Sequence, residues 1–206
     1  MRIKTVFLVC IIFSASQVAC GQAQKAPAKQ ELGEPGPPAP KAEKVKVADA
    51  PEVDKGRIKK KAEELSTAFV EGDFGRVADL TYPDLVELSG GKAKIVSKLE
   101  IGMGGWRAQG FQLSSLSVDE PTQVIKARDY LFAVVPATMR MKVPEGVLAQ
   151  QTFHLGVSRD GGETWTFVDG GGTGKEKLKI LFPTVASAID SLELPEEKLP
   201  TLEKKQ

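Results

Sequence analysis

The chain has 206 residues, 41% of them hydrophobic and 27% charged, and it carries a formal net charge of +1. This length suits one domain with tails, and the composition allows a packed core. Because the chain has no strong basic field, no nucleic-acid partner is expected.

The N-terminus has the order of a secretory signal. Arg2 and Lys4 precede the apolar run TVFLVCIIFSA, which is too short to span a bilayer comfortably, and small residues follow it. The pattern predicts a signal peptide over residues 1–20 and therefore an exported protein. Cys20, directly after Ala19, resembles the cysteine of a bacterial lipobox, which implies lipidation of Cys20 and a lipid anchor in a membrane.

An ordinary signal peptide is the alternative. Gln17 stands where the lipobox usually has an apolar residue. Cleavage by ordinary signal peptidase within residues 18–23 would leave a secreted protein in place of one anchored in the cell envelope. In both cases Cys10 is removed with the apolar run, so no intramolecular disulfide is expected.

Residues 21–56 have the composition of a linker. They contain no aromatic residue and are rich in proline, alanine, lysine and glutamate. Such a segment buries too little apolar area to offset the entropy of ordering, so we expect a disordered, partly extended linker.

Three helical segments are predicted after this linker. Gly72 ends the first, Asp73 is a candidate N-cap of the second, and Pro83 breaks the second and opens a further short element. The apolar positions at helical spacing are Ile58, Ala62, Leu65 and Phe69 in the first segment and Ile95, Leu99 and Met103 in the third.

A glycine-rich stretch, GMGGWRAQGF, follows the third helical stripe and carries Trp106 and Arg107. We expect a loop between the last helix and the sheet. It would act either as a mobile pocket lid with an aromatic floor and an anion-binding arginine, or as a loop with one buried tryptophan.

The next part of the chain alternates as strands do. Pro136 lies inside the long run DYLFAVVPATMRMKV, which predicts an edge strand or a bulge. The run GVLAQQTFHLGVS places His154 on one face with Thr152 and Gly156. Helices followed by antiparallel strands indicate the α+β class.

The stretch SRDGGETW matches the pattern Ser-x-Asp-x-Gly-x-Thr-Trp, which resembles the Asp-box of sialidase-like propellers. A propeller needs several blades, and the chain has one copy of the motif. We therefore predict a hairpin in which the aspartate bonds backbone amides and the tryptophan caps the turn. The motif residues are Ser158, Asp160, Gly162, Thr164 and Trp165.

Residues 172–206 are predicted to form a C-terminal helix and an exposed tail. GGGTGKEK fails as a phosphate loop, because Asp169 occupies the first glycine position and Glu176 replaces the magnesium-binding Ser or Thr. It is interpreted as a flexible joint. The apolar positions behind it are Leu178, Leu181, Val185, Ile189 and Leu192.

Residues 57–171, with the stretches AEELSTAFVEGDFGRVADLTYPDLVEL, GGKAKIVSKL and DGGETWTFVDG, resemble the nuclear transport factor 2-like (SnoaL-like) superfamily. The resemblance implies N-terminal helices packed on a curved antiparallel sheet, a cone-like fold. Members are cyclases, isomerases, dehydratases or non-catalytic binding and dimerisation modules, so the fold does not choose a function.

Enzymes of this family use an Asp or a His–Asp pair with tyrosines, which directs attention to one set of candidate pocket residues. The set is Tyr82, Trp106, Arg107, Tyr130, His154 and Asp169. His154, the one histidine, is interpreted as a surface residue, with a pocket or a dimer face as alternatives. No catalytic residue is assigned, and neither a metal site nor a cofactor is expected.

The sequence thus favours an exported, lipid-anchored domain that binds a small apolar ligand or a partner without chemistry. One alternative is a proton-transfer enzyme that uses a pocket Asp or His with Tyr. The other is a dimeric structural module, with a second copy of the chain as its partner.

Overall fold

The computed structural model describes residues 47–49, 52–196 and 198–204. The predicted signal peptide, Cys20 and most of the predicted linker lie outside these residues. The helices are α1 (Lys55–Glu71), α2 (Phe74–Leu80), α3 (Pro83–Leu88), α4 (Lys92–Ala108), α5 (Lys175–Leu181), the 3₁₀ turn η1 (Pro183–Val185) and α6 (Ala186–Ile189). The strands are β1 (Val47–Asp49), β2 (Gln112–Val118), β3 (Gln123–Ala127), β4 (Tyr130–Val143), β5 (Gly146–Ser158), β6 (Thr166–Asp169) and β7 (Thr201–Lys204).

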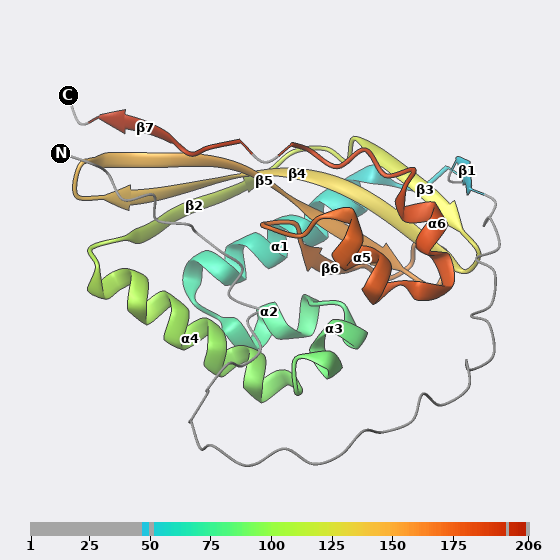
Figure 1. Cartoon of the computed structure of the whole chain (residues 1–206), viewed down its shortest axis with the longest axis horizontal. Helices are drawn as coiled ribbons and strands as arrows, with labels where there is room; N and C mark the ends of the chain where they lie inside the picture. Colours follow the sequence, from blue (N-terminus) through green and yellow to red (C-terminus); the bar gives the residue numbers. More distant parts are fainter. Residues whose placement is uncertain (1–46, 50–51, 197, 205–206) are drawn as a thin grey trace, which may run out of the picture.

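All these strands belong to one antiparallel sheet, which confirms the predicted α+β class. The strand order is β1-β3-β4-β5-β6, while β2 also pairs with β4 and β7 also pairs with β5. Figure 1 shows the four N-terminal helices along one side of the long β4–β5 hairpin, and β7 along its outer edge.

The N-terminal helices begin and end where local chemistry predicts. Asp54 caps α1 by accepting from the backbone N of Gly56 at 2.9 Å. Gly72 ends α1 with φ of 80°, a left-handed conformation that glycine adopts without a Cβ clash. Asp73 then caps α2 by accepting from the backbone N of Arg76 at 3.0 Å, as expected.

Pro136 lies inside β4 with strands on both sides, so the expected edge strand or bulge is wrong. β3 pairs with β4 up to Val134 and β2 pairs from Ala137, which leaves Pro136 at the junction between them. Its carbonyl oxygen accepts from the backbone N of Asp119 at 2.9 Å. The N and C=O of a strand residue point to the same side, so the missing N–H faces this junction and no ladder bond is lost.

The first core lies between α1, α2 and α4 and one face of the sheet. Trp165 and Phe167 are buried together on this face, as the alternation predicted. The sheet contributes Leu131, Ala133, Val135, Ala137, Met141, Trp165 and Phe167, and the helices contribute Ile58, Ala62, Leu65, Phe74, Val77, Leu80, Ile95, Leu99 and Met103.

The second core covers the opposite face and depends on the C-terminal segment. The sheet supplies Tyr130, Phe132, Val134, Phe153, Leu155, Val157 and Val168, against Leu178, Phe182, Val185, Ile189 and Leu192. The expected single helix is divided, since Pro183 opens η1 between α5 and α6. Residues 198–203 are exposed, as expected for the tail, but residues 201–204 form β7 and pair with β5, which was not predicted.

Two further expectations are corrected at the ends of the helical region. The linker does not extend to residue 56, because β1 pairs with β3 and α1 begins at Lys55. The loop expected around Trp106 and Arg107 is helical, since α4 continues to Ala108. Within the described ranges, no helix has the length and apolar character needed to cross a membrane.

Candidate functional site

Three polar side chains follow one another on a single face of β5. Gln150, Thr152 and His154 alternate along the strand, and we call them the polar row. The ladder pairs them with Met139, Ala137 and Val135 of β4, so they lie on the face of the first core. The row is therefore a polar strip beside an apolar strand.

His154 is buried, with 4% of its surface exposed, so its interpretation as a surface residue is wrong. The helices cover this face of the sheet, and Ser66 of α1 lies over the ring, with Oγ 3.4 Å from Nε2. Nδ1 is buried and has no hydrogen-bond partner among the described residues. Burial lowers the pKa of His154, and the nearby Asp169 acts in the opposite direction, so the ring is neutral at pH 7.

Asp169 is the direct neighbour of His154 across the ladder between β5 and β6. The surrounding strands raise the pKa of its carboxyl, while His154 and the backbone amides of Gly170 and Gly171 lower it. Asp169 is the last residue of β6, and its side chain lies at the exposed end of that strand. The structure thus brings together two of the six candidate pocket residues.

The edge of β5 is open beside the polar row. β6 pairs with residues 154–157 and β7 with residues 146–149, and no described strand pairs with residues 150–153 on this side, although the backbone N of Gly170 donates to the carbonyl oxygen of Phe153 at 2.8 Å. A pocket of about 20 Å³ lies in this gap. Its lining residues are Gln150, Gln151, Thr152, Phe153, Gly170, Gly171, Pro195 and Glu196.

Gly171 keeps a small space open between two of the polar groups. A Cβ at this position would lie 3.4 Å from Oδ2 of Asp169 and 3.7 Å from Oγ1 of Thr152. Both oxygen atoms therefore approach one point on the pocket wall. Oε1 of Gln150 is buried and has no hydrogen-bond partner among the described residues. A ligand that donates hydrogen bonds would satisfy these acceptors.

Tyr82 and Tyr130 lie in the second core, away from His154. Tyr82 donates from its hydroxyl to Oδ2 of Asp84 at 2.9 Å, and burial raises its pKa far above the usual range. Its ring packs on Phe182, with centroids 5.0 Å apart. The sheet separates these tyrosines from the polar row, so the predicted set does not form one pocket.

Trp106 and Arg107 lie on α4 and contribute nothing to the polar row. Trp106 is half-buried against the first core, and Arg107 is exposed. A helix in place of the expected loop excludes the proposed lid.

The hairpin motif forms a closed network. Ser158 Oγ donates to Oδ1 of Asp160 at 2.7 Å and accepts from the N of Gly162 at 2.9 Å. Asp160 also accepts from the backbone N of Thr164 at 3.0 Å, and Trp165 Nε1 donates to the carbonyl oxygen of Gly162 at 3.1 Å. The Thr164 hydroxyl, which donates to Oδ2 of Asp160, lowers the pKa of Asp160 well below its usual range, and the backbone N–H of Thr164 and the Ser158 hydroxyl act in the same direction. The predicted role of the motif as a capped hairpin is confirmed.

Sequence reasoning missed Ser66, Gln150 and Thr152 as members of the site. A signal for Ser66 was present, because it follows Ala62 by four residues on the buried face of the first helix. In the described part of the chain, no group of three or more His, Cys, Asp and Glu side chains could hold a metal ion.

Comparisons with family models, with characterised proteins and with solved structures found no match to this chain.

Proposed function

We propose that this chain is an exported, lipid-anchored protein whose cone-like α+β domain binds a small ligand or a partner without transforming it. The binding site is the gap in the edge of β5, beside the polar row. The domain would belong to the nuclear transport factor 2-like group, and the linker would hold it away from the membrane surface.

One observation carries the binding proposal. Gln150 Oε1 and His154 Nδ1 are buried on the same strand face without partners, and Gln150 lines an open pocket. A buried polar atom without a partner costs about 1–3 kcal/mol, so a fold that keeps two of them on one face of a strand gives up stability. A bound ligand that supplies the missing partners would recover part of that free energy.

The binding function is tested on the full chain purified under native conditions. Native mass spectrometry should show a bound small molecule or partner in the wild type and a reduced fraction bound in Gln150→Leu. Gln112→Leu, which makes the same change at an exposed position of β2 outside the pocket lining, is the matched control. Equal occupancy in all three proteins would contradict a site at this gap.

A second function, proton transfer, is favoured by a different observation. His154 is buried, shares a hydrogen bond with Ser66 and faces Asp169 across the ladder. A neutral histidine next to a carboxylate is a competent general base when a substrate reaches it. Incubation of the ligand found above with the full chain decides between the functions. Unchanged ligand supports binding alone, whereas conversion that is lost in His154→Gln supports the enzyme.

The lipid anchor rests on the sequence around Cys20. Two acyl chains on one residue hold a protein at a membrane stably, whereas one chain gives marginal binding. We expect the intact mass of the protein from the membrane fraction to include the acyl chains on a chain that starts at Cys20. Cys20→Ser should release the protein or leave the uncleaved precursor. A mature N-terminus beyond Cys20 without acyl mass would contradict the anchor.

A further inference from the structure

We infer that the gap in the edge of β5 binds a protonated primary amine. This inference rests on the proposed binding function and names the chemistry of its ligand. Its basis is that two hydrogen-bond acceptors approach one point beside a pocket the size of one ammonium group.

The polar side chains at the gap can all act as acceptors. The carboxylate of Asp169 and the hydroxyl oxygen of Thr152 approach the point that a Cβ of Gly171 would occupy. Gln150 also lines the pocket, and its buried Oε1 has no hydrogen-bond partner among the described residues. An ammonium group has three N–H donors and no acceptor, so it complements a site lined by such oxygen atoms.

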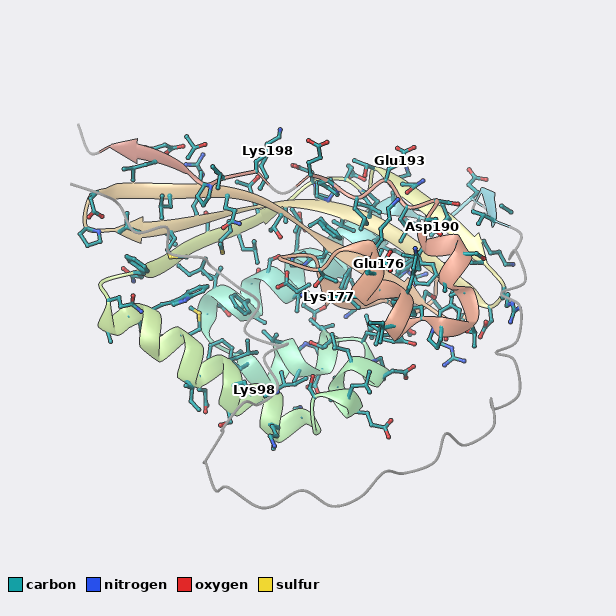
Figure 2. All side chains as sticks on the ribbon, in the orientation of Figure 1. Lys98, Glu176, Lys177, Asp190, Glu193 and Lys198 are labelled. Atoms are coloured by element: carbon teal, nitrogen blue, oxygen red, sulfur yellow. The ribbon has the colours of Figure 1, made fainter. Side chains whose placement is uncertain are left out.

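The charges around the gap also favour a cation. Asp169 lies at the end of β6 and Glu196 lines the pocket, and both are exposed. Lys177, a positive group in the same connection, donates from its Nζ to the carbonyl oxygen of Gly172 at 2.8 Å. Figure 2 shows Lys177 on the C-terminal helical segment, whereas Lys98 lies on α4 in the other helical layer. His154 adds no positive charge, because burial keeps its ring neutral.

The size of the pocket selects among cations. A volume of about 20 Å³ is enough for a group the size of one water molecule. The terminal ammonium of an alkylamine has this size, whereas a quaternary ammonium is larger and has no N–H to donate. Charge-assisted hydrogen bonds from N–H to carboxylate are also about twice as strong as neutral ones.

Gly171 offers a substitution that blocks the site with little disturbance of the fold. Its backbone is outside the positive-φ region, and the distances from an added Cβ to Asp169 and Thr152 are ordinary contacts. A methyl group there would occupy the space between the two oxygen atoms. Gly174, in the same connection, is the matched control, because a Cβ at that position meets no atom within 4 Å.

The experiment titrates the full chain with methylammonium chloride and follows the backbone amide resonances of Gln151, Thr152 and Gly172 by NMR. We expect saturable shifts in the wild type and in Gly174→Ala. In Gly171→Ala the affinity should fall at least about tenfold, the loss of one charge-assisted hydrogen bond. Unchanged melting temperatures in both variants show that the fold is retained.

Tetramethylammonium chloride, with the same charge and no N–H donor, controls for ionic strength and should give no saturable shift. Equal binding of both salts, equal affinity in Gly171→Ala, or no shift with methylammonium would each overturn the inference. A parallel titration with Nα-acetyllysine amide identifies the source of the amine. Tighter binding than methylammonium points to a lysine of a partner protein, and equal or weaker binding points to a free amine.

The two proposals fail in different ways. If methylammonium does not bind but Gln150→Leu still loses the native ligand, the gap is a binding site and the amine chemistry is wrong. If methylammonium binds and no native ligand depends on Gln150, the amine site stands and the proposed function is wrong.

Discussion

Two polar clusters lie along the same strand, and they differ in how their hydrogen bonds are completed. In the hairpin that follows β5, Ser158, Asp160 and Thr164 bond to one another and to the backbone of the turn. In the polar row, Gln150 and His154 each keep a buried atom without a partner in the described structure. The first arrangement stabilises the fold, whereas the second costs stability and leaves acceptors for a ligand.

The largest effect on stability is expected at Trp165, which anchors the hydrogen-bonded hairpin in the first core. Trp165→Ala should lower the free energy of unfolding by about 3–5 kcal/mol, because the ring is 3% exposed and its removal leaves a cavity. Urea denaturation measures the loss. Trp106→Ala is the control and should cost less, since Trp106 is half-buried. Wild-type stability in Trp165→Ala would contradict its place in the core.

Removal of the central carboxylate tests the closed network directly. Asp160→Ala should cost about 1–3 kcal/mol, as expected for lost hydrogen bonds to a charged group. The pKa of Asp160 is lowered in the folded state, so its contribution is present above its ordinary value of 3.8 and is lost as the pH falls below it. Asp129→Ala, which removes an exposed ion pair with Arg159, should cost about 1 kcal/mol or less. A smaller loss of unfolding free energy in Asp160→Ala than in Asp129→Ala would contradict the stabilising role of the hydrogen bonds in the hairpin.

The contribution of the polar row to stability should depend on pH in a different range. Burial lowers the pKa of His154, so the folded state takes up fewer protons than the unfolded state below the ordinary value of 6.5. Stability should be constant above about pH 6.5 and fall as the pH decreases toward about 5. In His154→Gln this fall should be smaller. Thermal unfolding across the range measures both proteins, and identical profiles would contradict a neutral, buried His154.

The smallest change in stability is expected at Gln150, at one end of the polar row. Gln150→Leu removes a buried acceptor without a partner, so the free energy of unfolding should stay within about 1 kcal/mol of the wild type or rise. The same variant should lose the ligand in native mass spectrometry. A loss of more than about 2 kcal/mol in the free energy of unfolding would show that Gln150 stabilises the fold, as the hydrogen-bonded residues of the hairpin do.

The sequence predicted those parts of the fold that depend on local chemistry. Gly72 and Asp73 mark the boundary between α1 and α2, and the alternation of β4 and β5 shows which residues share a face. The hairpin was also predictable, because its bonds connect residues at most four positions apart.

Burial of His154 was not predictable, because alternation identifies two faces without showing which one a helix covers. Ser66, which lies over the ring, is 88 positions away in the chain. The same limit applies to Pro136. A proline inside a central strand is compatible with the sheet only because β2 and β3 pair with different halves of β4, and this pairing is not visible in the sequence.

The division into two cores also separates the aromatic residues that absorb and emit in the near ultraviolet. The chain has two tryptophans and two tyrosines. Trp106 and Trp165 both pack in the first core, and Tyr82 and Tyr130 both lie in the second. Tryptophan fluorescence therefore reports on the layer of N-terminal helices, and tyrosine circular dichroism reports on the layer built by the C-terminal segment. Without any introduced label, the wild-type protein carries one optical probe for each side of its sheet.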